Sequence, residues 1–152
     1  MSITELAPAK LNLTLDVGAR RPDGYHEITS VMQSAALYDV VTLETVETDD
    51  IVVECPGTDL PTGPDNLAWK AADVFFQETN ILHTGIFIRL EKKIPSQAGL
   101  GGGSSDAASV LRGMRRLFST NVSDEALEAM AARVGSDVPY CCLLYTSDAA
   151  DE

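Results

Sequence analysis

One stretch, PSQAGLGGGSSDAAS from Pro95 to Ser109, limits most strongly what this chain can fold into. A strand is expected before it, because Ile86, Ile88 and Leu90 fall on one face of an alternating segment. A helix is expected after it, since apolar residues recur at helical spacing in Val110, Leu111, Met114, Leu117 and Phe118. A flexible linker would have no regular structure on either side. The stretch is therefore interpreted as a tight loop between a strand and a helix.

The glycines of this loop suit the binding of phosphate. Glycines at 99 and 101–103 let the backbone approach an oxyanion closely, and Ser104 or Ser105 is expected to cap a helix whose exposed N–H groups face it. The P-loop and dinucleotide templates both fail, because a glycine and a serine stand where they need lysine and glycine. Use of some glycines for packing alone stays an alternative. Since the loop has no lysine, triphosphate charge would be met by Mg²⁺ and by basic residues, with Lys10, Lys92 and Lys93 as candidates.

The other predicted elements are strands and helices in mixed order. Strands are expected at Lys10 to Val17, from His26 toward Leu37, at Val40 to Glu44 and at Ile51 to Glu54. Helices are expected after Asp65 and Ser123, which can cap them, and Gly135 is placed to end the second. Because the order lacks the strict alternation of a doubly wound sheet, an α+β fold is favoured.

Charge and cysteine content exclude several classes of function. Eleven Lys and Arg against 23 Asp and Glu give a net charge of -12, which would repel nucleic acid and an anionic membrane surface. Neither a signal peptide nor a run of bilayer length is found, so a cytoplasmic protein is expected. Cys55, Cys141 and Cys142 form no ligand motif and are expected to be reduced, structural thiols.

Three motifs carry a resemblance to a known family. PSQAGLGGGSSDAA resembles the ATP-binding motif of the GHMP kinases, which are small-molecule kinases unrelated in fold to the P-loop enzymes. APAKLNLTLDVGARRPDGYHEITSVMQS, from Ala7 to Ser34, and GSDVPY, from Gly135 to Tyr140, resemble the branch that phosphorylates 4-diphosphocytidyl-2-C-methyl-D-erythritol in non-mevalonate isoprenoid precursor biosynthesis. The resemblance implies ATP and Mg²⁺, and a ribosomal protein S5 domain 2-like domain in which a mixed sheet packs with helices.

The resemblance also implies roles for individual residues. Asp137 would accept the proton of the substrate hydroxyl, and Lys10 would pair with this carboxylate and with the transferred phosphate. Asn12 would bind the substrate, whereas Tyr25 and His26 would recognise its cytosine. The implied ATP-binding residues are Asn66, Lys92, Pro95, Ala98, Gly99, Leu100, Gly101, Gly102, Gly103, Ser104 and Ser105, with Ser104 or Ser105 as the candidate metal contact through Mg-ATP.

Simpler interpretations of these residues stay open. Asp137 suits a turn, and Lys10 suits the solvated face of a strand. Asn66 and Lys92 suit a helix start and a surface position. Asp106 would lie near the metal or favour the helix N-terminus, and the sequence does not decide between these roles.

The resemblance covers only the first of the family's two domains. Residues 1–142 are expected to form the GHMP kinase N-terminal, ATP-binding domain, with the C-terminal domain absent. Residues 143–152 do not match the family's continuation and look like translated sequencing adapter. Such a truncated kinase is expected to have little or no activity. The alternatives are another GHMP kinase, acting on homoserine, mevalonate or a sugar, and a non-catalytic nucleotide-binding fragment; the oligomeric state is left open.

Overall fold

The computed structural model describes residues 1–20, 26–95 and 102–142, and within residues 10–36 it describes the backbone alone. Predictions for Tyr25, Ala98, Gly99, Leu100, Gly101 and the last ten residues lie outside this range. The elements in chain order are β1 (Ser2–Arg20), β2 (His26–Val46), β3 (Ile51–Glu54), α1 (Leu67–Thr79), β4 (Gly85–Glu91), α2 (Gly102–Leu117) and α3 (Asp124–Val134). Residues 138–142 are also helical. The fold is α+β, as the sequence predicted.

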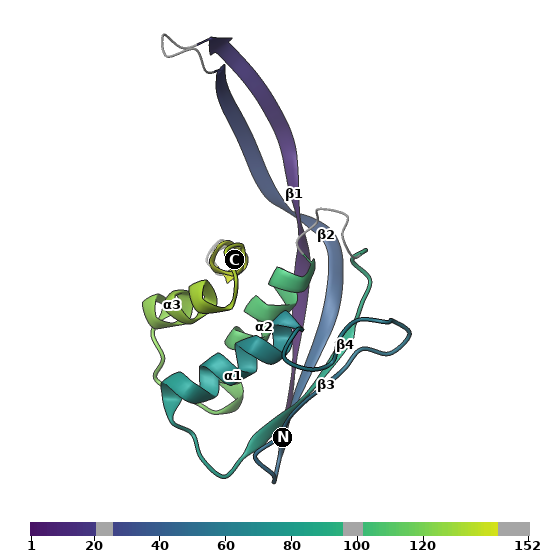
Figure 1. The fold of residues 1–152 in the computed structure, drawn as a ribbon, viewed down its shortest axis with the longest axis vertical. Helices are drawn as coiled ribbons and strands as arrows, with labels where there is room; N and C mark the ends of the chain where they lie inside the picture. The colour runs from purple at the N-terminus through teal and green to yellow at the C-terminus, as the bar shows by residue number, and fades with distance from the viewer. Residues whose placement is uncertain (21–25, 96–101, 143–152) are drawn as a thin grey trace.

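The four strands form one mixed sheet in the order β1-β2-β4-β3. β2 is antiparallel to both β1 and β4, whereas β3 and β4 are parallel. The helices lie together on one face of this sheet (Figure 1). β2 pairs with β4 only along residues 40–46, and beyond that point β1 and β2 continue as a hairpin that projects past the helices (Figure 1).

The first two strands are longer than the sequence predicted. β1 begins at Ser2 rather than Lys10, and β2 is continuous where two separate strands were expected. The pairing of β1 with β2 contains register shifts, one of them between Pro8 and Lys10. The predicted break before Val40 was wrong because Asp39 is fully buried in the strand, where hydrogen bonds satisfy its carboxylate.

Two of the predicted helix starts also need correction. Asn66 caps α1 by accepting a hydrogen bond from the Ala68 N–H at 2.8 Å, so the expected cap at Asp65 is wrong by one residue. α2 begins at Gly102, which places Ser104 and Ser105 inside its first turn rather than at its cap. The predictions for α3 are confirmed, since Ser123 caps its start and Gly135 its end.

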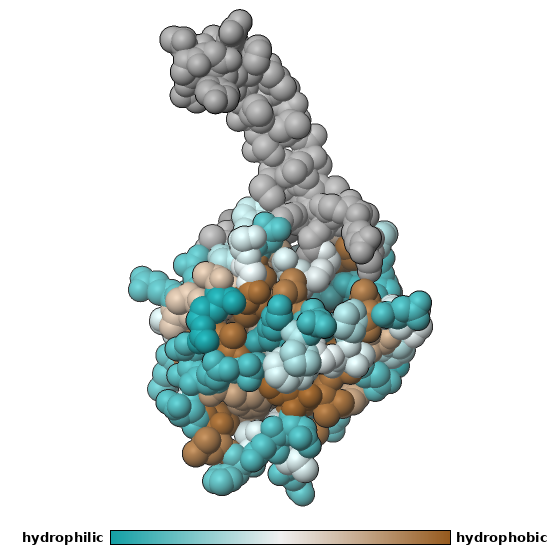
Figure 2. All heavy atoms as spheres, viewed as in Figure 1, coloured by the Kyte–Doolittle hydropathy of each residue, from teal (hydrophilic) through white to brown (hydrophobic). Residues whose placement is uncertain are grey.

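The core lies between the helices and the sheet. Its largest fully buried side chains are those of Phe75, Leu43, Ile86, Ile88, Leu90, Leu111 and Met114. α2 approaches the sheet closely at Gly113, where a Cβ atom would lie 2.3 Å from Cδ1 of Leu43. The face of the body in Figure 2 is mostly hydrophilic, with apolar residues in separate patches. Within the described residues, no helix has both the length and the apolar character of a membrane span.

Candidate functional site

Three elements meet through charged side chains beside the start of α2. Asp39 comes from β2, Lys92 follows β4, and Asp106 lies in α2. The Lys92 Nζ atom lies 2.6 Å from Oδ2 of Asp39 and 2.6 Å from Oδ2 of Asp106. The side chains are 8%, 0% and 3% exposed for Lys92, Asp39 and Asp106. These three residues, called the carboxylate–lysine cluster below, therefore join two strands of the sheet to the helix in the interior.

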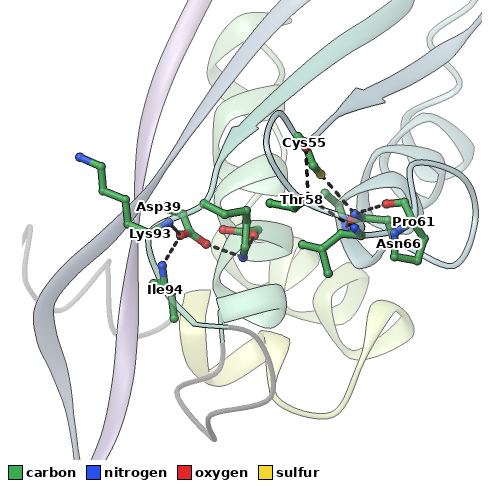
Figure 3. A network of polar contacts seen from close by, with 11 residues as sticks. Asp39, Cys55, Thr58, Pro61, Asn66, Lys93 and Ile94 are labelled. Atoms are coloured by element: carbon green, nitrogen blue, oxygen red, sulfur yellow. Dashed lines mark hydrogen bonds and ion pairs between the residues drawn. The ribbon is translucent and has the colours of Figure 1, made fainter.

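The two carboxylates of the cluster have different environments. Oδ1 of Asp39 accepts hydrogen bonds from the backbone N–H groups of Lys93, at 2.6 Å, and Ile94, at 2.8 Å (Figure 3). Oδ1 of Asp106 is buried and has no hydrogen-bond partner among the described residues. Asp39 is therefore held by Lys92 and by two backbone N–H groups, whereas Asp106 is held by Lys92 and by its interaction with Asp39.

The pKa values follow these environments. Burial alone would raise the pKa of Asp39, but its interactions with Asp106, Lys92 and the two backbone N–H groups outweigh burial and lower it. Burial and the nearby Asp39 carboxylate hold the pKa of Asp106 well above its ordinary value. Burial opposes the charge of Lys92, but the two carboxylates prevail and raise its pKa. Lys92 is therefore charged at neutral pH, and the idea of an ordinary surface lysine is wrong.

The first two residues of α2 have different reasons to be glycine. A Cβ atom at Gly102 would lie 3.0 Å from Cγ2 of Ile94 and 3.3 Å from Nζ of Lys92, so this residue packs directly on the cluster. At Gly103 the nearest atom to a Cβ would be Cδ1 of Leu67, at an ordinary 3.7 Å. Packing alone accounts for Gly102. At Gly103, which is exposed, packing does not require a glycine, and the backbone is open to solvent there.

The start of α1 lies beside the start of α2, because a Cβ atom at Gly103 would lie 3.7 Å from Cδ1 of Leu67, the first residue of α1. Asn66, the cap of α1, also donates from Nδ2 to the Pro61 carbonyl at 2.8 Å and contacts Sγ of Cys55 at 3.9 Å (Figure 3). The structure thus brings together Asn66, Lys92 and the first turn of α2. Unpaired N–H groups at a helix start attract anions, so this region can bind phosphate.

The other predicted site residues lie on separate elements. Lys10 and Asn12 pair with Ser34 and Met32 in the β1–β2 hairpin, whereas His26 pairs with Arg20 farther along it. Eight residues separate His26 from Ser34, which is about 26 Å along a strand, so the backbone does not bring His26 close to Lys10.

Asp137 lies on a further element, in an exposed turn between α3 and the helical residues 138–142. Its backbone carbonyl accepts a hydrogen bond from the Cys141 N–H at 3.3 Å. The turn therefore presents this carboxylate at the surface, and its predicted catalytic role stays a prediction.

A cavity of about 460 Å³ lies elsewhere, between the end of α1 and the start of α3. Glu78, Thr120, Met130 and Arg133 are among its lining residues. Thr120 follows the C-terminal end of α2, so this cavity is remote from the first turn of that helix and none of the predicted site residues lines it.

Two members of this region were missed by the sequence analysis. Asp39 is an aspartate within the apolar run of a strand, and this position was the available signal, because a charged residue buried in such a place needs a partner. Cys55 was predicted only to be a structural thiol, and it is buried and free beside Asn66.

Comparison with known proteins decides the family. Residues 66–144 match the model of the N-terminal domain of GHMP kinases. The chain belongs to the GHMP kinases. A homoserine kinase from Cytophaga hutchinsonii, 18% identical, shares the fold with a TM-score of 0.69 over 92% of this chain and 42% of that one. The α+β fold expected from the resemblance is therefore confirmed.

More similar GHMP kinases have one name in common. The 4-diphosphocytidyl-2-C-methyl-D-erythritol kinase of Macrococcus caseolyticus is 46% identical over 145 residues, 95% of this chain and 51% of that one. The enzyme of that name from Caldicellulosiruptor saccharolyticus is 44% identical over 135 residues, 89% of this chain and 46% of that one. A solved 4-(cytidine 5'-diphospho)-2C-methyl-D-erythritol kinase is 40% identical with a TM-score of 0.73, over 93% of this chain and 49% of that one. The chain thus spans about half the length of these relatives.

Proposed function

We propose that this chain is the ATP-binding half of a GHMP kinase that transfers the γ-phosphate of ATP to a hydroxyl of 4-diphosphocytidyl-2-C-methyl-D-erythritol. The observation that carries the proposal is the 46% identity, over 95% of the chain, with the Macrococcus caseolyticus kinase of that name. The carboxylate–lysine cluster and the glycine at 103 support it, because they give the helix start a fixed position and an accessible backbone.

ATP would bind with its phosphates at the first turn of α2. The N–H groups of that turn supply hydrogen bonds, and the helix dipole favours the negative charge. Mg²⁺ would arrive with the triphosphate and neutralise part of its charge, since the described residues hold no cluster of three or more His, Cys, Asp or Glu that could bind an ion. Ser104, which is partly exposed, fits a contact to this ion better than Ser105, which is buried.

The chemistry at the acceptor would need a carboxylate and a cation. Asp137 is exposed, so a substrate hydroxyl can reach it and transfer its proton as the phosphate moves. Lys10 would pair with this carboxylate and stabilise the transferred phosphoryl group. Asn12 would orient the substrate, and Tyr25 and His26 would select its cytosine.

The test is release of ADP from Mg-ATP, with and without the diphosphocytidyl substrate. In the complete kinase, with its second domain present, we expect substrate-dependent release that falls about 100-fold or more in Asp137→Asn, because the amide cannot accept a proton. Asp49→Asn, at an exposed turn after β2, is the matched control and leaves the rate unchanged. Equal, substrate-dependent rates for Asp137→Asn and the unmodified complete kinase would refute the assignment of the base.

The same assay separates the alternative functions. Turnover of homoserine, mevalonate or a sugar without any need for cytidine would identify another GHMP kinase. Binding of Mg-ATP without transfer to any alcohol would identify a nucleotide-binding fragment.

Residues 1–142 are proposed as the N-terminal domain, and residues 143–152 as a segment foreign to it.

A further inference from the structure

We infer that Lys92 is a positioning residue that holds the first turn of α2 against the sheet, and that it acts on ATP through this turn rather than as a ligand. The inference rests on the proposed function in one respect, that ATP binds at the start of α2. It assigns a role to Lys92 and its two carboxylates that differs from the direct contact predicted from the sequence.

The bonds of the ammonium group support a structural link. Its two charge-assisted contacts, both 2.6 Å, reach Asp39 and Asp106, which are 67 residues apart in the chain. An anion that took Lys92 as a ligand would have to compete with these two buried carboxylates. The cluster also has no surplus of positive charge, since two carboxyl groups face one ammonium. The geometry therefore favours support of the first turn of α2 over direct binding.

Asp39 and Asp106 would keep different interactions if Lys92 were removed. Asp39 keeps its hydrogen bonds from the N–H groups of Lys93 and Ile94. Asp106 keeps only its interaction with the Asp39 carboxyl group, because its Oδ1 atom has no partner among the described residues. Gly102, which packs on the ammonium, would also lose this contact. Loss of Lys92 should therefore loosen the first turn of α2 while leaving the strands in place.

The other end of α2 supplies a matched control. Arg116, in the last turn, lies 2.8 Å from Oε1 of Glu5, which is 2% exposed on β1. Arg116→Met leaves a buried carboxylate without its cation, as Lys92→Met does, and it also breaks a link between this helix and the sheet. The two variants differ in which end of α2 they release.

The first measurement is backbone amide hydrogen exchange of the full chain without nucleotide. In Lys92→Met we expect exchange at residues 106–110, which bond to the carbonyls of the first turn, to accelerate about tenfold or more. In Arg116→Met the acceleration should instead lie at residues 113–117. Equal acceleration of both regions in both variants would overturn the inference, since it would indicate general destabilisation.

The second measurement separates a role of Lys92 in positioning α2 from a role in compensating the charge of Asp106. The double variant Lys92→Met with Asp106→Asn removes the uncompensated carboxylate, so its thermal midpoint should recover toward that of the unmodified chain. Exchange at residues 106–110 should stay fast and the Kd for Mg-ATP should stay about tenfold weaker or more, because the link is still missing. Recovery of all three quantities would show that Lys92 only compensates charge, and would overturn the inference.

Failure of the proposed function is visible separately. If the unmodified chain binds no Mg-ATP, the proposed function fails, and the exchange pattern alone decides whether Lys92 positions α2. Normal Mg-ATP affinity in Lys92→Met, together with slow exchange at residues 106–110, would refute the positioning role even in an active kinase.

Discussion

Asn66 joins three parts of the chain through one short side chain. Its Oδ1 atom accepts from the Ala68 N–H, and its Nδ2 atom donates to the carbonyl of Pro61. Helix caps of this kind satisfy an N–H group that has no partner inside the helix. Because Asn66 also contacts Cys55, it fixes the start of α1 relative to the end of β3.

We expect Asn66→Ala to lower the free energy of unfolding by about 1 to 2 kcal/mol, because both the cap and the bond to Pro61 are lost. Denaturant titration followed by circular dichroism measures this difference. Asp65→Ala is the control, since this exposed neighbour does not cap the helix, and we expect a change within about 0.5 kcal/mol. A larger effect at Asp65 than at Asn66 would contradict the observed cap.

At the level of elements, α2 is the best-anchored helix of the molecule. The carboxylate–lysine cluster joins its first turn to the sheet, Gly113 lies close to β2, and Arg116 pairs with β1. The first two contacts involve β2, through Asp39 and Leu43, and the third involves Glu5 on β1. The position of this helix is therefore determined along its whole length rather than at one point.

Gly113→Ala should destabilise the fold although alanine is the better helix former. The new Cβ would lie 2.3 Å from Cδ1 of Leu43, a fully buried side chain with little space to move into. Overpacking of about 1 to 3 kcal/mol exceeds the helical gain of about 1 kcal/mol. Gly103→Ala, whose Cβ has an ordinary 3.7 Å contact, is the control in thermal unfolding. Equal midpoints for the two variants would contradict the close approach of helix and sheet.

Patterns among neighbouring residues predicted those helices and strands that depend on neighbouring residues. Alternation located β4, helical spacing located α1 and α3, and Ser123 and Gly135 marked the ends of α3. The continuity of β2 could not be predicted, because burial of Asp39 depends on Lys92, 53 residues away. For the same reason Lys92 was assigned to ATP or the surface. The cap of α1 was predicted at Asp65, one residue from Asn66, because both residue types suit a cap.

At the scale of the whole molecule, the chain spans about half the length of its relatives. Among residues 1–20, 26–95 and 102–142 the sheet and helices share one core, and the family match covers residues 66–144. A second domain would supply the remaining wall of a substrate cleft.

We therefore expect the coding DNA read from the codon of Val138 onward to continue into a Gly-rich segment and a second domain of similar size. Long-read sequencing of the source DNA makes this measurement. A confirmed stop codon after Glu152 would contradict it and would favour the nucleotide-binding fragment among the alternatives.

The projecting hairpin has a mechanical consequence. β2 is continuous from His26 to Val46, and only residues 40–46 lie between two neighbouring strands (Figure 1). The free part acts as a lever of about 46 Å, so a rotation of about 5° at its base moves its tip by about 4 Å. The position of the His26 backbone relative to the body is thus governed by the torsional stiffness of two strands at the edge of the sheet.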